Sequence, residues 1–247
     1  MKTDKNSQKT VLITGITSGI GREIALKYAE KGWNILGHYC SSEEKVKELK
    51  KIIDAYGVKC YLFKADFLSE HEVIRLINNV KKFRIDSLIN NAGTYVAKKH
   101  FSKLTTKDVT STFMVNIFAP MILTSRIFMN MKKRRFGRIV NISSIAAKYG
   151  GSGYSLHYGC SKRALEGITK TLAREGAECN VLVNTVRPGV IDTDFHRKFP
   201  KDMRKRIAMI PLKKMGTPED VADIVYYLGS EKNSFITNEI ITVAGGE

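Results

Sequence analysis

Short apolar runs with the character of strands alternate with helical segments along the whole chain. The strand candidates are rich in β-branched residues and lie at residues 10–15, 33–39, 59–66, 86–93, 137–144, 181–189 and 239–246. Helical patterning occupies residues 21–31, 41–57, 69–83, 106–131, 157–177, 201–209 and 218–229. Such alternation predicts a mostly parallel sheet with helices on both faces. We therefore expect one doubly wound α/β domain of seven strands over residues 1–247, with residues 1–9 flexible.

A doubly wound sheet binds its ligands beyond the carboxyl ends of its strands. The first strand candidate runs into the sequence TGITSGIG, residues 14–21, and a helix follows. Glycines allow a tight turn and let backbone N–H groups approach a pyrophosphate, which a helix N-terminus also attracts. This context favours a Rossmann-type dinucleotide site, although an ordinary strand–helix turn uses the same residue types.

Composition excludes several classes of protein. The 43% hydrophobic and 26% charged residues are enough to bury a core. The polar N-terminus lacks the apolar stretch of a signal peptide, and no apolar run reaches the roughly 18 residues of a membrane helix. The four cysteines are widely spaced without a C-x-x-C pair, which argues against a metal site or a disulfide framework. We expect a cytoplasmic protein with no membrane contact.

The net charge of +17 raises the question of a partner. A strongly basic protein can bind nucleic acid, a membrane surface or an acidic protein. The densest basic run is KKRR at residues 132–135, and no nucleic-acid-binding signature accompanies it. We interpret the charge as a solvated lysine-rich surface. An acidic protein or a phosphorylated ligand is the preferred alternative, and nucleic acid is not expected.

Two tyrosines each stand four residues before a lysine: Tyr158 before Lys162, and Tyr95 before Lys99. On a helix this spacing places both side chains on one face. A phenol has a pKa near 10, and a neighbouring ammonium lowers that pKa toward a range useful for proton transfer. Spacing alone also fits a surface pair without function. Tyr95 follows a turn and lies in no predicted helix, so we assign it to the cofactor-site rim or a substrate loop.

Several motifs, in order along the chain, resemble those of the short-chain dehydrogenase/reductase family. They are T-G-x-x-x-G-x-G from Thr14, NNAG at residues 90–93, NISS at residues 141–144, Y-x-x-x-K from Tyr158, and RPGVIDT at residues 187–193. The resemblance covers about residues 10–246. It implies an NAD(P)-dependent oxidoreductase that acts on an alcohol or a ketone.

The resemblance also implies a catalytic set. Tyr158 would act as the general acid, and Ser144 would donate a second hydrogen bond to the carbonyl oxygen. Lys162 would lower the pKa of Tyr158 and contact the nicotinamide ribose, while Asn116 would hold a water that connects Lys162 to bulk solvent. Ketone reduction needs such donors together with a hydride source above the carbonyl carbon. Taken singly, each residue also fits a purely structural role, and no metal is expected.

Cofactor preference depends on the end of the second strand, where an acidic residue would favour NAD. Tyr39 stands there, so we favour NADP(H) over NAD(H). Ser18 and Cys40 stand where NADP-preferring relatives often carry arginine, while Ser41 and Ser42 are able to bind a phosphate. The expected cofactor contacts are Gly15, Thr17, Ser18, Gly19, Ile20, Gly21, Tyr39, Ser41, Ser42, Asp66, Phe67, Asn91, Ala92, Gly93, Tyr158, Lys162, Pro188, Gly189, Val190, Ile191 and Thr193.

Within the family, the segments KKRRFGRIVNISS and IPLKKMGTPEDVADIVYYLGSE most resemble the 3-oxoacyl-[acyl-carrier-protein] reductases of fatty acid biosynthesis. That likeness implies a homotetramer, built partly through the helices that start near Thr106 and His157. It also implies that Arg135 and Arg174 dock an acidic carrier protein near the mouth of the active site.

Departures from the reductase pattern keep other functions open. They are the loop after NNAG, one extra residue between Ser144 and Tyr158, and ITN and VAGG in place of ITG and DGG. A sugar or a steroid-like ketone therefore remains an alternative substrate. A nucleotide-binding regulator without catalysis is a further alternative. We expect the substrate pocket to be lined by Tyr149, Tyr154, His157, Val190 and Phe195.

Overall fold

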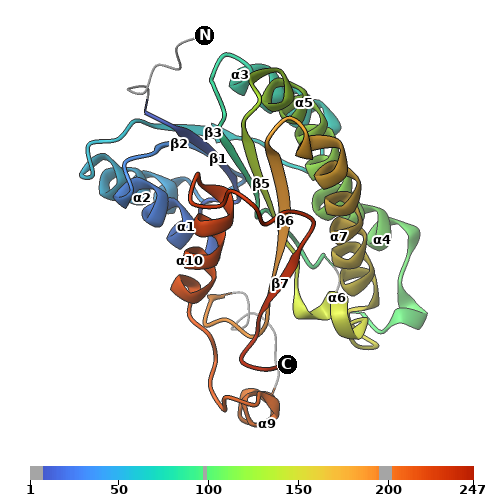
Figure 1. Ribbon diagram of the computed structural model, residues 1–247. Coiled ribbons are helices and arrows are strands. Elements are labelled where there is room, and N and C mark those ends of the chain that lie inside the picture. The colour runs from blue at the N-terminus through green and yellow to red at the C-terminus, as the bar shows by residue number, and fades with distance from the viewer. Residues whose placement is uncertain (1–7, 97–98, 195–201) are drawn as a thin grey trace.

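The computed structural model describes residues 8–96, 99–194 and 202–247 (Figure 1). Their strands form one sheet in the order β3-β2-β1-β4-β5-β6-β7, and every neighbouring pair is parallel. The predicted seven-stranded doubly wound sheet is confirmed, and it is entirely rather than mostly parallel over the described residues. The strands are β1 (Thr10–Thr14), β2 (Asn34–Tyr39), β3 (Cys60–Lys64), β4 (Ser87–Asn90), β5 (Gly137–Ile142), β6 (Val181–Pro188) and β7 (Ile240–Val243).

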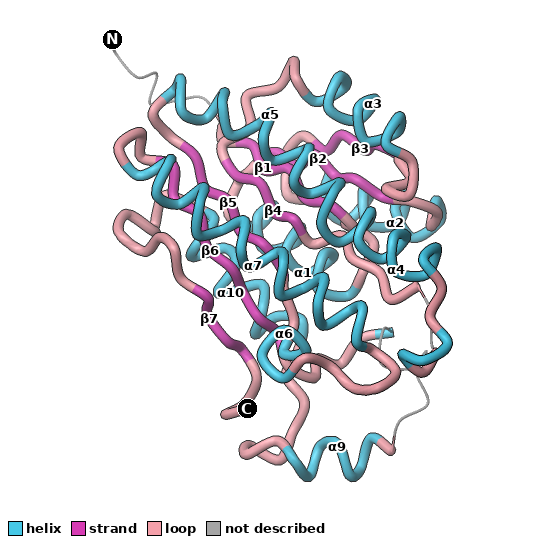
Figure 2. The backbone as a smooth tube through the Cα atoms, turned by 90° about the vertical axis from the view of Figure 1, so that its right-hand side faces the viewer, coloured by secondary structure: helices cyan, strands magenta, loops and turns pink. Residues whose placement is uncertain are grey.

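Helices cover both faces of the sheet (Figures 1 and 2). One face packs against α1 (Gly19–Glu30), α2 (Glu43–Asp54) and α10 (Pro218–Gly229). The other packs against α3 (Glu70–Val80), α5 (Ala119–Arg134) and α7 (Leu156–Ala177). Two short helices, α6 (Ile145–Tyr149) and α9 (Met203–Met209), lie beyond the carboxyl ends of the strands, where α9 projects from the domain.

Burial on both faces explains why the strands are apolar throughout. In β1, Val11 and Ile13 enter the core beneath α1 and α10, while Leu12 enters the core beneath α3 and α5. Alternate side chains of a strand point to opposite faces, so a strand covered on both sides needs apolar residues at successive positions. The apolar runs of the sequence therefore become the central strands of the sheet.

The predicted helix over residues 106–131 is one continuous helical rod with a π-helical segment inside it. It comprises α4 (Thr106–Phe113), the π-helix Met114–Phe118 and α5, so it reaches Arg134. At 29 residues, with a mean hydropathy of 1.4 in its most apolar window, it is long and apolar enough to cross a membrane. More than half of that window is buried, and Leu123, Ile127 and Met131 pack into the core. We interpret it as a core helix whose apolar residues are interrupted by polar ones, so that no continuous apolar run marks it in the sequence.

Two short helices escaped prediction. Helix α6 begins after Ser144, whose Oγ accepts a hydrogen bond from the backbone N–H of Ala146, and ends at Gly150 with φ +78°. The other is a 3-10 turn at Phe101–Lys103. Elements of three to five residues are too short to show a helical period.

The N-terminal segment that we expected to be flexible is described only in part. Residues 1–7 lie outside the described residues. Gln8 donates to the carbonyl oxygen of Gly32, and Lys9 forms an ion pair of 3.0 Å with Glu231. Gln8 and Lys9 are therefore held against the domain by contacts with Gly32 and Glu231.

Candidate active site

The glycine loop after β1 is fastened to the turn after β4. The side-chain amide of Asn91 donates to the carbonyl oxygens of Thr14 and Gly15, at 2.9 and 3.0 Å, and to Ser18 Oγ at 3.1 Å. Ser18 Oγ in turn accepts from the backbone N–H of Gly21 and so caps α1. One amide of the NNAG motif thus fixes the shape of the loop at the switch point of the sheet.

Three glycines mark where the loops approach each other closely. A Cβ on Gly19 would lie 2.6 Å from Cγ2 of Thr193, and a Cβ on Gly21 would lie 2.5 Å from Nδ2 of Asn91. A Cβ on Gly93 would lie 2.9 Å from Nζ of Lys162. A Cβ at Gly19 or Gly21 would displace the neighbouring loop, so close packing favours glycine there, whereas Gly15 is the position whose left-handed backbone, with φ +68°, favours glycine.

The loop after β6 completes this corner. Thr193 contacts the start of α1, and Ile191 bridges to Gly216. Val190 is buried, and its carbonyl oxygen accepts from the N–H of Gly216 at 3.0 Å. The structure therefore places the predicted contacts after β1, β4 and β6 at the carboxyl ends of neighbouring strands: Gly15, Thr17, Ser18, Gly19, Ile20, Gly21, Asn91, Ala92, Gly93, Pro188, Gly189, Val190, Ile191 and Thr193.

A histidine that the sequence analysis did not single out organises the end of β2. His38 is buried, and its Nδ1 accepts from the N–H of Gly15 at 3.2 Å, while Nε2 donates to the carbonyl oxygen of Ala65 at 2.9 Å. Its ring stacks on Phe67 with the centroids 4.0 Å apart. Burial lowers the pKa of His38 to about 4, so the ring is neutral near neutrality and keeps this bonding pattern. In the sequence, His38 stands out only as a polar residue within the mostly apolar segment WNILGHY.

The surroundings of Tyr39 contain a cation that the sequence analysis also missed. Lys64 pairs in register with Tyr39 at the ends of β3 and β2, and its Nζ lies 2.6 Å from Oε1 of Glu43. Asp66 is exposed, and its Oδ1 accepts from the N–H of Leu68. The predicted contacts Ser41 and Ser42 lie between β2 and α2. This corner therefore combines hydroxyl groups with a lysine.

Tyr158, Ser144 and Lys162 meet at the carboxyl ends of β4 and β5. The Ser144 side chain neighbours the Tyr158 hydroxyl closely enough to act on its pKa. Lys162 is buried, its Nζ donates to the carbonyl oxygen of Ile142 at 2.9 Å, and it lies 6.0 Å from the centre of the Tyr158 ring. Helix α7 carries both the tyrosine and the lysine, whereas Ser144 follows β5. The structure thus brings the three predicted side chains into one group.

Burial determines the proton affinities of this group. The pKa of Tyr158 is raised above its usual value of 10 because burial disfavours the phenolate, and the neighbouring Ser144 opposes this effect only in part. Burial lowers the pKa of Lys162 to about 8. At Tyr158 the effect of burial is therefore larger than that of Ser144, and the role of Lys162 in lowering the pKa of Tyr158 stays a prediction.

Asn116 lies in the π-helical segment and is buried. Its Oδ1 accepts from the N–H of Thr94 at 2.8 Å, and its Nδ2 donates to the Thr94 carbonyl oxygen and to Ser161 Oγ, both at 2.9 Å. These bonds tie the loop after NNAG to α7. The side chain thus joins two walls of the site, and the water-holding role implied by the resemblance stays a prediction.

The second tyrosine–lysine pair is split between two environments. The Tyr95 ring lies 5.8 Å from that of Tyr158, and its hydroxyl donates to the carbonyl oxygen of Tyr154. Lys99 instead forms an ion pair of 2.9 Å with Asp108. The placement of Tyr95 at the site is confirmed, and Lys99 belongs to a surface contact at the start of α4.

The predicted substrate-pocket residues divide by exposure. Tyr149 and Tyr154 are each 59% exposed, whereas His157 and Val190 are buried. Phe195 lies outside the described residues.

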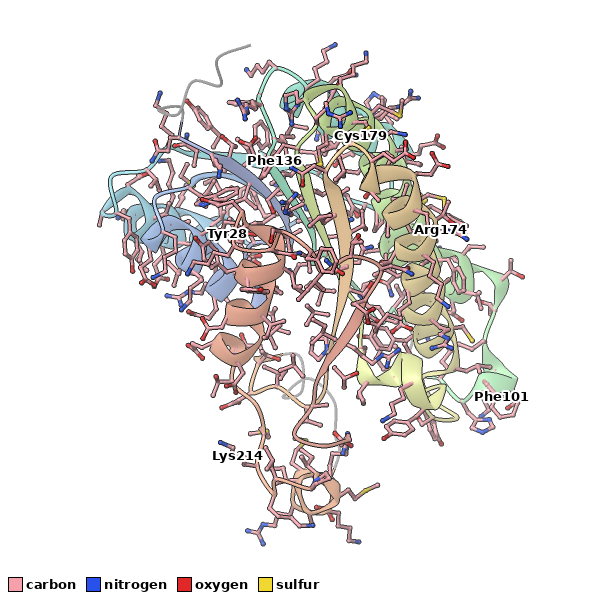
Figure 3. The ribbon with its side chains drawn as sticks, in the orientation of Figure 1. Tyr28, Phe101, Phe136, Arg174, Cys179 and Lys214 are labelled. Atoms are coloured by element: carbon pink, nitrogen blue, oxygen red, sulfur yellow. The ribbon has the colours of Figure 1, made fainter. Side chains whose placement is uncertain are left out.

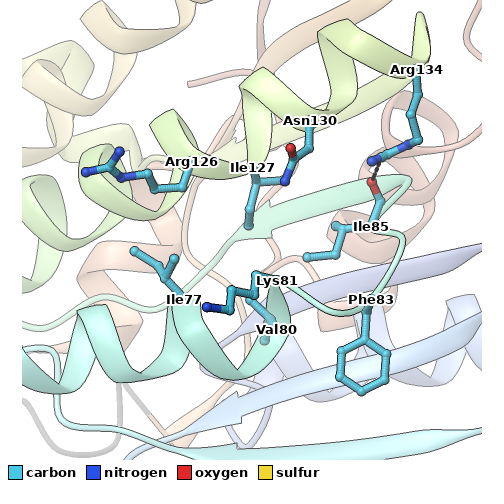
Figure 4. Close-up of a pocket in the computed structure, with 9 residues that line it drawn as sticks. All are labelled: Ile77, Val80, Lys81, Phe83, Ile85, Arg126, Ile127, Asn130 and Arg134. Carbon is cyan, nitrogen blue, oxygen red and sulfur yellow. Dashed lines mark hydrogen bonds between the residues drawn. The ribbon is translucent and has the colours of Figure 1, made fainter.

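A cavity of about 30 Å³ lies between α3 and α5 and is lined by Phe83, Ile127 and Arg134 among others (Figure 4). None of the predicted site residues lines it. It lies near the amino end of β4, where Arg134 donates to the Ile85 carbonyl oxygen, and is unrelated to the chemistry.

The two arginines expected at the mouth of the site lie far from it within one chain. Arg135 ends α5 with φ +53° and donates to the carbonyl oxygen of Glu178. Arg174 is in the last turn of α7 (Figure 3). At 1.5 Å per residue it lies about 24 Å along the helix from Tyr158. The predicted position is wrong for a single chain, because α7 begins at the site and ends near the amino ends of the strands.

These features fit a dinucleotide. Helix α1 has no acidic residue in its first turn, so its N-terminus is open to the charge of a pyrophosphate. The loop before it is held in shape by Asn91, and a hydroxyl pair and a buried lysine lie at the neighbouring strand ends. The arrangement defines a site for hydride exchange between a nicotinamide cofactor and an alcohol or a ketone.

Comparisons with known proteins agree with this class. A family model described as enoyl-(acyl carrier protein) reductase matches residues 15–247. A relative from Aquifex aeolicus, named 3-oxoacyl-[acyl-carrier-protein] reductase FabG, is 38% identical over 241 residues, which are 96% of each chain.

Two solved structures share the fold closely. YwfH, described as an NADPH-dependent reductase involved in bacilysin biosynthesis, aligns with a TM-score of 0.90 and 26% identity over 97% of this chain and 98% of its own. The 3-oxoacyl (acyl-carrier-protein) reductase from Agrobacterium tumefaciens C58, solved with NADP bound, aligns with a TM-score of 0.89 and 27% identity over 97% and 94%.

The fold and the site together define an NAD(P)-dependent oxidoreductase. The chain belongs to the short-chain dehydrogenase/reductase family.

Replacement of Asn91 by alanine is expected to weaken dinucleotide binding. The variant loses three hydrogen bonds to the glycine loop, each worth roughly 1 kcal/mol. The Kd, measured by fluorescence titration, should rise about 10- to 100-fold. Asn130→Ala, which changes an exposed asparagine on α5, serves as the control. An unchanged Kd for Asn91→Ala would contradict the proposed loop-holding role.

Lys162 should make the free energy of unfolding rise with pH. Between its native pKa of about 8 and the ordinary value of 10.5, the unfolded chain binds more protons than the native state. Raising the pH from 7.5 to 10 should therefore stabilise the wild type relative to Lys162→Met by roughly 2 kcal/mol in urea unfolding. Lys170→Met, an exposed site on the same helix, should show the wild-type pH dependence. Parallel curves for wild type and Lys162→Met would disprove the low pKa.

Proposed function

We propose that the protein is a cytoplasmic NADPH-dependent carbonyl reductase that acts on a 3-oxoacyl thioester carried by acyl-carrier protein. The observation that carries the proposal is the grouping of the Tyr158 and Ser144 hydroxyls beside the buried Lys162. Two hydroxyl groups that meet in this way are able to donate to one carbonyl oxygen. Such paired donors stabilise the negative charge that develops on that oxygen during reduction.

In this mechanism the chain's residues handle the oxygen and its proton. Ser144 donates a hydrogen bond to the carbonyl oxygen and orients the substrate. Tyr158 donates a second hydrogen bond and transfers its proton as the oxygen becomes an alkoxide. Bound NADPH supplies the hydride to the carbonyl carbon. Lys162 then stabilises the phenolate that remains on Tyr158, since a nearby positive charge favours the ionised phenol.

NADP(H) is favoured over NAD(H) by the corner at the ends of β2 and β3. Tyr39 replaces the acidic residue that would bind an unphosphorylated ribose and repel a 2′-phosphate. Lys64, which forms an ion pair with Glu43 in the structure, lies at the same corner, where Ser41 and Ser42 supply hydroxyl groups that are able to bind a phosphate. The structural relatives solved with NADP bound or described as NADPH-dependent add support.

Support for the 3-oxoacyl substrate comes mainly from relatives. The Aquifex aeolicus and Agrobacterium tumefaciens proteins carry that name, whereas YwfH is assigned to bacilysin biosynthesis. The description of the family model names enoyl reduction instead. The pair of hydroxyl donors suits a carbonyl oxygen, so we place carbonyl reduction first. Sugar or steroid-like ketones and a non-catalytic regulator are the remaining alternatives.

Tyr158→Phe should abolish turnover while NADPH binding survives, because the variant loses only the proton donor. We expect kcat to fall by at least about 100-fold in an assay that follows NADPH absorbance, with the Kd for NADPH within about threefold of wild type. Tyr227→Phe, on the exposed part of α10, should retain full activity. A Tyr158→Phe variant with wild-type kcat would rule out the mechanism.

The same assay with a panel of substrates separates the alternatives. The panel contains a 3-oxoacyl thioester, an enoyl thioester, a keto sugar and a cyclic ketone. Preference for the 3-oxoacyl thioester supports the proposal, and preference for another member replaces it. NADPH binding without turnover of any member would favour the regulator.

We further propose a homotetramer, in which α5 and α7 of one subunit pack against the same helices of a second. Phe118, Met121 and Met129 expose their side chains along the helical rod, at positions that share one face. Exposed apolar groups at such spacing are typical of an interface. A two-fold axis would bring the end of one α7 beside the start of the other. Arg135 and Arg174 would then lie near the partner's site, where a carrier protein docks.

Light scattering tests the assembly. The wild type should have the mass of a tetramer, and the double variant Met121→Asp/Met129→Asp should fall to a smaller species because charge is buried at the interface. Met209→Asp, at an exposed methionine on α9, is the matched control and should stay tetrameric. A monomeric wild type, or a double variant that remains a tetramer, would contradict the proposed interface.

A further inference from the structure

Helix α7 places a third polar residue in line with the catalytic pair. Tyr158, Lys162 and Glu166 are each four residues apart, so their side chains lie on one face of the helix. Glu166 is only 2% exposed. A carboxylate in that position needs strong partners, because an isolated buried charge is costly.

The Glu166 carboxylate has such partners on both sides of the helix. It accepts from Ser143 Oγ at 2.8 Å, and from Nε and the terminal NH2 group of Arg187 at 2.8 and 2.9 Å. Arg163 adds a bond of 3.2 Å from the surface. The bidentate pairing with Arg187 fixes direction as well as distance, since a guanidinium presents its donors as a planar fork.

Each buried partner lies next to a segment of the site. Ser143 directly precedes Ser144, and its backbone N–H donates to the Val186 carbonyl oxygen at 2.8 Å. Arg187 is the next-to-last residue of β6, and residues 189–193 follow as the loop whose Thr193 lies against Gly19. Ser143 Oγ also lies 3.3 Å from the Lys162 carbonyl oxygen. One carboxylate thus joins α7, the end of β5 and the end of β6.

We propose that Glu166 is a positioning residue, which holds Ser144 against Tyr158 through Ser143 and holds the cofactor loop through Arg187. It contacts none of the reacting atoms, so it is not a catalytic residue. The inference rests on the proposed carbonyl reduction for its effect on turnover. Its effect on cofactor binding is independent of the substrate. Small displacements at a reacting centre are costly, so loss of this anchor should be visible in both quantities.

The three partners should give different kinetic signatures. Ser143→Ala releases only the serine side, so kcat should fall about fivefold with the Kd for NADPH within about twofold of wild type. Arg187→Gln releases the loop side, so the Kd should rise about tenfold. Glu166→Gln removes the charge and one of the two acceptor oxygens, which weakens both sides, so it should lower kcat about 10- to 100-fold and raise the Kd about tenfold. Glu175→Gln, at an exposed glutamate on the same helix, should change neither.

The measurements are NADPH fluorescence titration, kcat at saturating NADPH, and thermal unfolding of each variant. A purely structural Glu166 would lower the melting temperature alone, and wild-type kcat and Kd in the folded variants would overturn the proposal. If Glu166→Gln does not fold, Ser143→Ala and Arg187→Gln decide the matter in the same way. If the wild type reduces no ketone, the proposed function fails, while the Kd values of Arg187→Gln and Glu166→Gln still test the anchor.

Discussion

All strands of the described sheet run in parallel, and this constraint places every part of the site. Parallel strands finish at one edge, so the loops that follow β1, β4, β5 and β6 meet there although they are distant in sequence. The chain order reverses between β1 and β4, and open α/β sheets bind their ligands at such a switch point. The Asn91 side chain spans that switch point by bonding to the glycine loop. These bonds fix the glycine loop to the turn after β4.

Around the active site, burial disfavours the charged forms of the ionisable side chains on α7. The face of α7 that carries Tyr158, Lys162 and Glu166 packs into the protein, where a charged group loses its hydration. Tyr158 and Lys162 respond by favouring their neutral forms, whereas Glu166 is surrounded by guanidinium and hydroxyl donors. The chain thus supplies well-placed hydroxyl groups, but it does not by itself make Tyr158 a strong acid. In the proposed mechanism, the positive nicotinamide ring of a bound oxidised cofactor would add the charge that favours the phenolate.

Helix α7 is long enough to separate Tyr158, near its start, from Arg174, in its last turn. The helix begins beside Ser144 and ends at the amino ends of the strands, so Arg174 is remote from Tyr158 in the same chain. The partly exposed apolar rod of α4 and α5 runs beside it. The proposed tetramer explains both features: the exposed apolar side chains of the rod would be buried between two chains, and Arg174 would lie near the site of the partner subunit.

Much of the fold and site was predictable from sequence for physical reasons. Strands buried on both faces must be apolar, so the seven strands and the long helices were visible, and glycine turns and the Tyr158–Lys162 spacing marked the strand ends that carry chemistry. Tertiary structure alone decided which partners meet. His38 bonds to Gly15, Lys64 lies beside Tyr39, and Glu166 joins Ser143 to Arg187. It also set the balance of burial and charge at Tyr158, and it placed Arg135 and Arg174 away from the site. Such contacts and the loss of hydration depend on distances in space, which sequence spacing does not contain.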